Sequence, residues 1–285
     1  MSKIRLGFRE KQLLWRLPAG PTPDRAYPDG LTRSQREVYT RALRRLQNHG
    51  LAHCYPLMAR GGRGREIKSS LTAEGVAVRE ALRAQRASII ERASIASDAL
   101  YDWQSPETFT RREERLNRMI DDVSRLGADD WAHRERTFRD WREAWVLGHM
   151  FEEFGPQSVR LVPAGDGRPD AELRIRDDVL PVEITEALPP GHHPRQPILS
   201  FPHSDGGPAE WRARAMQVPG LVEAAISRKQ VKPYAREAVL LVYVSMNGSY
   251  GLAVDEVAAA IASLQAKHDG ATFRALRVLW AGRVF

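Results

Sequence analysis

The chain has 285 residues, of which 42% are hydrophobic and 28% charged, a composition typical of a globular protein long enough for two domains. No apolar run approaches the roughly 18 residues that a membrane-spanning helix needs, and the first residues, MSKIRLGFRE, lack the apolar block of a signal peptide. We therefore expect a cytoplasmic protein with no membrane partner. The single Cys54 excludes an internal disulfide framework and a multi-cysteine zinc site.

Positive charge is concentrated in the N-terminal part of the chain. The formal net charge is +7. The first 80 residues carry 16 Lys and Arg against 7 Asp and Glu, a net charge of +9, so the remaining 205 residues have a net charge of −2. A concentrated positive field favours a polyanionic partner, because each neutralised phosphate releases condensed counterions. The charge distribution therefore indicates a nucleic-acid partner for the N-terminal part.

Residues 31–49, LTRSQREVYTRALRRLQNH, predict an amphipathic helix. Thr32 and Ser34 are candidate caps at its start, and Gly50 follows as the stop. One face is apolar and should be buried; it consists of Val38, Tyr39, Ala42, Leu43 and Leu46. The opposite face is polar and cationic; it carries Arg33, Thr40, Arg41 and Arg44.

The residues after Gly50 predict a strand, a glycine-rich turn with three arginines, a second strand and a helix. A helix that ends in NHGL, followed by a hairpin that closes on LTAEG, resembles the winged helix-turn-helix of bacterial regulators over roughly residues 10 to 80. The resemblance implies that the cationic helix face lies along the major groove of DNA. It also implies that the turn reaches phosphates or the minor groove through Arg60, Arg63 and Arg65. Winged helices also serve as protein-docking or dimerisation modules, so that alternative stays open.

Residues 81–128 predict helices rich in Arg, Glu and Ala. The pattern breaks near DWQSPETF, where Pro106 is a favourable first residue for a second helix. Charges of both signs are interspersed along these helices, which is typical of a spacer or a dimer contact. This segment contains no catalytic motif.

The C-terminal part, residues 129–285, predicts an α/β domain. Its elements in order are a long helix over 129–154, strands at QSVRLVPA, AELRIRD and VLPVEIT, a helix at GLVEAAISRKQVKPY, a strand at AVLLVYVSM, a helix at DEVAAAIASLQAKH and a strand at FRALRVLWAG. This order predicts a mixed sheet flanked by helices on both faces. The continuous apolar run AVLLVYV is typical of a central strand that is buried on both faces.

One acidic residue opens the second of these strands and another lies inside the third: Asp170 in RPD and Glu183 in VEIT. Together with AISRKQVKPY and the hydrophobic strand after it, they resemble the PD-(D/E)xK, restriction-endonuclease-like nuclease superfamily over about residues 129 to 285. The resemblance implies that both acids bind Mg²⁺, with Mn²⁺ as an alternative, at the edge where the strands diverge. Hard cations held by oxygen ligands suit phosphodiester hydrolysis. A glutamate at the rim of the sheet, paired with an arginine, is the structural alternative for Glu183.

One position departs from the family's motif, because Thr185 stands where a lysine is expected, two residues after Glu183. Some members of the superfamily bring the lysine from the helix that comes after the third strand. Lys229 shares the apolar stripe of that helix and is the candidate for this role, with Lys232, one turn later, as the second choice. Glu152, in the first helix of this part, is a candidate for a further acid.

These patterns together predict a winged helix-turn-helix domain over 1–80, a helical spacer over 81–128 and a PD-(D/E)xK nuclease-like domain over 129–285. The predicted function is a metal-dependent endonuclease that acts on double-stranded DNA in defence, restriction or repair. A homodimer is compatible with this function, because cutting both strands needs two sites. Two alternatives remain: a non-catalytic DNA-binding transcriptional regulator with a degenerate nuclease-like domain, marked by Thr185, and a protein-interaction adaptor.

Overall fold

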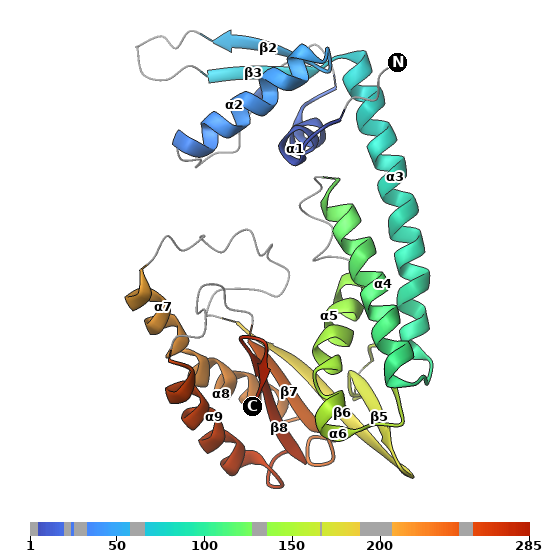
Figure 1. Cartoon of the computed structure of the whole chain (residues 1–285), viewed down its shortest axis with the longest axis vertical. Helices are drawn as coiled ribbons and strands as arrows, with labels where there is room; N and C mark the ends of the chain where they lie inside the picture. The colour runs from blue at the N-terminus through green and yellow to red at the C-terminus, as the bar shows by residue number, and fades with distance from the viewer. Residues whose placement is uncertain are drawn as a thin grey trace. The chain divides into compact units, whose positions relative to one another are not determined.

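Two compact units make up the chain in a computed structural model (Figure 1). The first unit comprises Met1–Ala93 with Arg118–Trp131, and the second comprises Ser94–Asn117 with Ala132–Phe285. The residues predicted as a spacer, 81–128, are thus divided between the two units. The structure describes residues 5–19, 24–25, 33–57, 66–126, 136–165, 167–188, 207–244 and 253–285.

The first unit combines helices with a three-stranded antiparallel sheet. It contains α1 (Phe8–Arg16), β1 (Asp24–Arg25), α2 (Arg33–Asn48), β2 (Ala52–Leu57), β3 (Glu66–Leu71) and most of α3 (Ala73–Asp98). The strand order is β1-β3-β2, and Ala52 of β2 pairs with Leu71 of β3. The predicted order of helix, strand, strand and helix around Gly50 is confirmed by α2, β2, β3 and α3.

Helix α2 packs against α1 through the apolar residues that repeat with helical spacing. Tyr39, Leu43 and Leu46 are buried in one core with Leu13 of α1. Val38 is an exception, because it is 38% exposed, and its predicted burial is wrong. Val38 lies roughly a quarter of a turn from the centre of the buried stripe, which is far enough for its side chain to meet solvent.

Helix α2 ends at a glycine, as its sequence predicts. Gly50 has a φ of 71°, in the left-handed region that residues with a Cβ rarely adopt. Its amide donates to the Gln47 carbonyl at 2.9 Å, and the Leu51 amide donates to the Leu46 carbonyl at 2.8 Å. This pair of hydrogen bonds is the Schellman motif, which satisfies carbonyls at the helix end and turns the chain toward β2.

The second unit is built on a six-stranded mixed sheet. Its strands are β4 (Ser158–Leu161), β5 (Ala171–Ile175), β6 (Asp178–Ala187), β7 (Val239–Val244), β8 (Ala275–Trp280) and β9 (Arg283–Val284), hydrogen-bonded in that order. β4, β5 and β6 are antiparallel, β6, β7 and β8 are parallel, and β9 returns antiparallel to β8. The strands predicted from the sequence are present, and β9 is an addition that its short pattern did not indicate.

Helices cover both faces of this sheet. α8 (Val218–Lys229) and α9 (Val254–His268) pack on one face, where Leu240 of β7 and Leu276 of β8 are buried. α5 (Arg136–Gly148) lies on the other face, where Arg142 pairs with Glu186 of β6 at 2.9 Å. β7 is buried along almost its whole length, as its apolar run predicts. The second unit is therefore a mixed α/β fold with its sheet between helices.

The single helix predicted over 129–154 is divided in the structure. α5 ends at Gly148, a residue type with low helix propensity, and the one-turn helix α6 (Phe151–Phe154) comes next. Residues 127–135 lie outside the described part of the chain. The remaining helices are η1 (Ala99–Tyr101), α4 (Pro106–Ser124), which begins at the predicted proline, and α7 (Pro208–Ala215). Among the described residues, no helix combines the length and the apolar composition that crossing a membrane requires.

A close approach at Gly75, in the first turn of α3, provides a test of packing in the first unit. A Cβ at this position would lie 1.9 Å from the carbonyl oxygen of Leu51, so only glycine allows α3 to approach the start of β2 in this way. Gly75→Ala should therefore destabilise the first unit by about 1–3 kcal/mol. Amide hydrogen exchange in α1, α2 and β2 measures this loss.

Gly220→Ala is the matched control for that substitution. Gly220 lies in α8, where an added Cβ meets nothing within 4 Å. Its replacement by alanine should stabilise the helix by about 0.5–1 kcal/mol, because alanine has the higher helix propensity. Equal effects of the two substitutions would show that Gly75 is not held against the backbone of Leu51.

Candidate functional site

Two acidic residues on neighbouring strands define a candidate site in the second unit. Asp170 immediately precedes β5, and Glu183 lies in the middle of β6. The antiparallel register pairs Ala171 with Val182, and the Asp170 amide donates to the Val182 carbonyl at 3.1 Å. The side chain of Asp170 turns toward β6, where its Oδ2 accepts from the Ile184 amide at 2.9 Å. The strand register thus brings the two acids together.

Both carboxylate oxygens of Glu183 have partners, although the residue is only 3% exposed. Lys229, the last residue of α8, forms an ion pair with Oε1. The Tyr234 hydroxyl donates to Oε2 at 2.6 Å, and it also lies 2.8 Å from the carbonyl oxygen of Arg168. These partners explain how an apolar strand accommodates a buried carboxylate, which would be strongly unfavourable if unpaired. They are a lysine and a tyrosine rather than the arginine of the structural alternative.

A third carboxyl group approaches from α5. Burial raises the pKa of Glu143 to about 8, and the negative charge of Asp170 adds to the rise. Burial also raises the pKa of Asp170, to about 6; Glu183 adds to that rise, and the Ile184 amide and the Lys229 charge oppose it. Neighbouring acids have this effect because adjacent negative charges repel one another. Burial and mutual repulsion therefore favour a proton on Glu143 near neutral pH.

An ionic network supports Glu143 from its own helix. The Nε atom of Arg139 lies 3.6 Å from Glu143 Oε1, and Nη2 of Arg139 lies 3.4 Å from Asp140 Oδ1. Asp140 is fully buried and also accepts a hydrogen bond from the hydroxyl of Ser97, near the end of α3. Hydrogen-bonded buried charges of this kind hold their helices in one arrangement. The network thus sets the position from which α5 presents Glu143.

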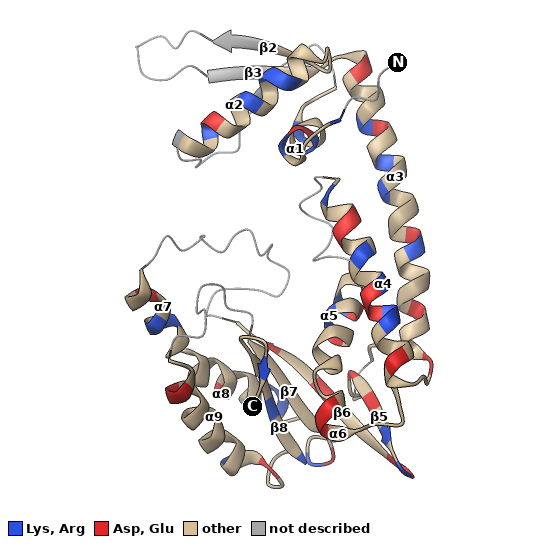
Figure 2. Cartoon of the chain, viewed as in Figure 1, with Lys and Arg blue, Asp and Glu red and all other residues tan. Residues whose placement is uncertain are grey.

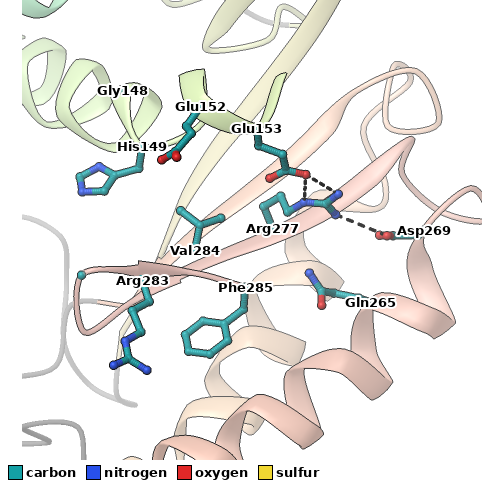
Figure 3. Close-up of a pocket in the computed structure, with 11 residues that line it drawn as sticks. Gly148, His149, Glu152, Glu153, Gln265, Asp269, Arg277, Arg283, Val284 and Phe285 are labelled. Carbon is teal, nitrogen blue, oxygen red and sulfur yellow. Dashed lines mark hydrogen bonds and ion pairs between the residues drawn. The ribbon is translucent and has the colours of Figure 1, made fainter. Parts of the chain in front are cut away.

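The acid that α5 brings to Asp170 is Glu143, which was not singled out from the sequence. Glu152, the predicted candidate, lies in α6 and lines a separate pocket of about 950 Å³ that Arg277 also lines (Figure 3). A signal for Glu143 is nevertheless present in the sequence. Glu143 lies three residues after Asp140 in the amphipathic helix α5. Acidic side chains in or beside a buried stripe require partners.

The cation against Glu183 comes from Lys229 and not from the motif position. Thr185 is 8% exposed and lies on the same face of β6 as Glu183, two residues away. Its hydroxyl supplies no charge. Lys232 comes one turn after Lys229, and its amide donates to the Lys229 carbonyl at 3.1 Å. The structure therefore brings Asp170, Glu183 and Lys229 together.

The acid pair fits a hard divalent cation by its chemistry. Mg²⁺ binds in proteins through one or two carboxylates and keeps water in its remaining positions. Asp170 and Glu183 supply such a pair, and burial, followed by the negative charge of Glu183, raises the pKa of Asp170. Within the described ranges, no group of three or more His, Cys, Asp or Glu side chains is arranged to hold a metal, so the fit rests on this pair.

The predicted DNA-binding residues lie in the first unit and are described in part. Arg41 and Arg44 are exposed on α2, away from its buried stripe. Figure 2 shows Lys and Arg positions in blue along α2. Thr40 is half-buried, and its hydroxyl donates to the Arg36 carbonyl at 2.8 Å. Arg33 is the first residue of α2, and its side chain lies outside the described part of the chain. The predicted residues of the turn also fall outside it; they are Arg60, Arg63 and Arg65.

No protein-family model, no curated protein and no solved structure matches this chain. Function is therefore inferred from the geometry and the charge of the site.

The raised pKa of Glu143 predicts that stability falls as pH rises. Its pKa is about 8 in the folded chain, against an ordinary value of 4.5, so the folded state binds more protons than the unfolded state between these values. The contribution of Glu143 to the free energy of unfolding is then fully present below about pH 4.5 and is lost progressively toward about pH 8. Glu143→Gln removes this dependence. In metal-free buffer, the free energy of unfolding should fall with rising pH more steeply in the wild type than in Glu143→Gln. The difference between the two slopes should be up to about 1.4 kcal/mol per pH unit.

Urea unfolding at about pH 5 and about pH 8 measures the two slopes. Glu152→Gln is the matched control, since Glu152 is an exposed acid of α6, and its slope should equal that of the wild type. Parallel slopes for the wild type and Glu143→Gln would contradict a protonated carboxyl group at this position.

Proposed function

We propose that this chain is a metal-dependent DNA endonuclease of the PD-(D/E)xK type, which a winged helix in its first unit directs to duplex DNA. The meeting of Asp170, Glu183 and Lys229 is the observation that carries the proposal. These residues come from the start of β5, the middle of β6 and the end of α8. Two acids and an ammonium group are the set that the family's chemistry needs, and Lys229 takes the part that Thr185 cannot perform.

Phosphodiester hydrolysis needs a nucleophilic water and compensation of the charge that develops on the phosphoryl group. A bound Mg²⁺ supplies charge stabilisation and lowers the pKa of its water. Asp170 and Glu183 would hold the ion through their carboxylate oxygens. The Lys229 ammonium group, fixed by its ion pair with Glu183, orients the attacking water and balances negative charge as the bond breaks.

The order of elements in the second unit supports this assignment. α5, β4, β5, β6, α8, β7, α9 and β8 succeed one another along the chain, in the order that the resemblance to the nuclease superfamily implies. β6 and β7 are parallel, so α8 must carry the chain back across the sheet between them. Its last residue then lies at the end of the sheet where β7 begins, and Val239 at that end pairs with the neighbour of Glu183. A lysine at the end of α8 is thus well placed to act on Glu183.

The charge and the element order of the first unit support a DNA-binding role. Its first 80 residues carry a net charge of +9. α2 buries one face and exposes Arg41 and Arg44 on another, and β2 and β3 come directly after it. A cationic helix of this kind suits the major groove, where its arginines contact phosphates or base edges.

A DNA-binding regulator with an inactive second unit is the second candidate, and Thr185 is the observation in its favour. Loss of the motif lysine would impair both water activation and charge neutralisation. The ion pair between Lys229 and Glu183 favours the nuclease instead, because it restores a cation to the acids from another element. The two candidates differ in one measurable property, which is cleavage of DNA.

Incubation of the full chain with supercoiled plasmid and Mg²⁺ or Mn²⁺ tests the proposal. The wild type should nick the plasmid. Asp170→Asn should abolish nicking, because it removes a carboxylate from the metal site. Lys229→Met should lower the nicking rate by about 10²-fold or more, the usual contribution of a positioned group that assists proton transfer. Gel quantitation of the relaxed plasmid measures all three rates.

Lys267→Met is the matched control for Lys229→Met. Lys267 is an exposed residue of α9 that pairs with Glu223 at 3.4 Å, so this variant should nick at the wild-type rate. DNA binding without cleavage in either metal would identify the regulator. Absence of both DNA binding and cleavage would favour the protein-interaction adaptor.

The salt dependence of DNA binding tests the role of α2. Arg41→Ala and Arg44→Ala should each weaken binding to duplex DNA, because each removes a cation that neutralises phosphate. Each should also lower the slope of log affinity against log salt concentration by about 1. Arg92→Ala removes the same charge from an exposed position of α3 and should leave the slope unchanged. Fluorescence anisotropy over a salt series gives the slopes, and three equal slopes would exclude α2 from the interface.

A further inference from the structure

The phenol group of Tyr234 joins the two acid-bearing segments of the candidate site. Its oxygen lies 2.6 Å from Glu183 Oε2 and 2.8 Å from the carbonyl oxygen of Arg168. Arg168 precedes Asp170 by two residues, in the connection that leads into β5. Both neighbours are acceptors, whereas a phenol group carries a single hydrogen. Tyr234 can therefore satisfy only one of them fully at a time.

Tyr234 reaches this position from the short segment between α8 and β7. Its carbonyl accepts from the amides of Glu237 and Ala238, at 3.1 and 3.2 Å, and Pro233 restricts the backbone just before it. The next residue, Ala235, is buried in the core of the unit. The tyrosine ring thus enters the site from a backbone that is held at several points.

The two partners of Glu183 differ in the cost of releasing its carboxylate. The Lys229 ammonium group balances the carboxylate with a full opposite charge. The Tyr234 hydroxyl is neutral and already has a second acceptor within hydrogen-bond distance, the Arg168 carbonyl. The hydroxyl can change its acceptor from Glu183 to that carbonyl and still donate a hydrogen bond. It therefore avoids the cost of an unsatisfied polar group. Oε2 is therefore the oxygen of Glu183 that can turn to a new partner at the lower cost.

We infer that Tyr234 is a positioning residue that orients Glu183 Oε2 in the metal-free chain and transfers its hydrogen bond to the Arg168 carbonyl when Oε2 becomes a metal ligand. This inference rests on the proposed function, since it assigns Glu183 to the metal site. In the first arrangement the tyrosine fixes the orientation of the Glu183 carboxylate. In the second it restrains the connection that carries Asp170. One hydroxyl thereby links the placement of the two acids.

Calorimetric titration of the full chain with Mn²⁺ alone tests this inference without a cleavage reaction. Tyr234→Phe keeps the ring and removes the hydroxyl. The dissociation constant for Mn²⁺ should fall about 5-fold, because the metal-free chain loses the stronger hydrogen bond, to the carboxylate, whereas the metal-bound chain loses only the weaker one, to the carbonyl. Tyr101→Phe is the matched control. It removes another phenol oxygen of the second unit, one that accepts from Arg136 at 3.3 Å, and its affinity for Mn²⁺ should equal that of the wild type.

A near-ultraviolet difference spectrum adds a readout that a purely structural role would not change. A hydrogen bond to a carboxylate is stronger than one to a carbonyl, so the transfer alters the environment of one phenol group. Addition of Mn²⁺ should therefore shift tyrosine absorption in the wild type and in Tyr101→Phe, but not in Tyr234→Phe. If Tyr234→Phe fails to fold, the wild-type spectrum decides, because absence of the shift overturns the transfer.

The outcomes distinguish this inference from the proposed function. Suppose that the wild type binds Mn²⁺, that Asp170→Asn abolishes binding, and that Tyr234→Phe binds as tightly as the wild type. The positioning role is then overturned and the nuclease proposal stands. Weaker binding by Tyr234→Phe also overturns the transfer, because it would mean that the hydrogen bond to Glu183 persists in the metal-bound chain. If the wild type binds no Mn²⁺, or Asp170→Asn binds it equally well, the metal site and this inference fail together.

Discussion

Compensation of the negative charge on Glu183 is the constraint on which the arrangement of the second unit depends. The residue is almost fully buried in β6, between the apolar residues Val182 and Ile184. Its charge is held by an ammonium group from α8 and a hydroxyl group from the segment that comes after that helix. Loss of one partner from a buried ion pair typically costs about 3–5 kcal/mol, a large share of the stability of an ordinary domain. The end of α8 and the segment between α8 and β7 are therefore tied to β6 by polar contacts as well as by the apolar core.

The acids on the α5 side of the site are balanced less completely. Arg139 serves both Asp140 and Glu143, and burial together with the charge of Asp170 raises the pKa of Glu143. Such groups oppose folding, because a buried acid must either keep its proton or lose solvation. Strongly perturbed groups of this kind cluster at functional sites and in structural ion-pair networks. Burial and mutual repulsion thus distinguish Glu143 and Asp170 from Glu183, whose charge is paired with an ammonium group.

Secondary structure could be predicted well wherever a segment shows its buried face in its own residues. The stripe of α2, the apolar run of β7 and the stop at Gly50 are local patterns, and each corresponds to an element or a boundary in the structure. The errors are local as well. Val38 lies at the margin of a stripe, where the helical period alone does not decide exposure. The helix over 129–154 is divided near Gly148, because a long amphipathic pattern does not exclude a break inside it.

The sequence by itself determined the order of most helices and strands, the two acids on neighbouring strands and a lysine on the sheet-facing stripe of the helix that comes after them. Only the tertiary structure decided that Glu143 approaches Asp170 and that Tyr234, 51 positions along the chain from Glu183, donates to its carboxylate. The physical reason is the distance along the chain over which each feature is determined. The period of a helix or strand is set by adjacent residues, whereas a contact between distant residues depends on strand register and on where a crossover helix ends.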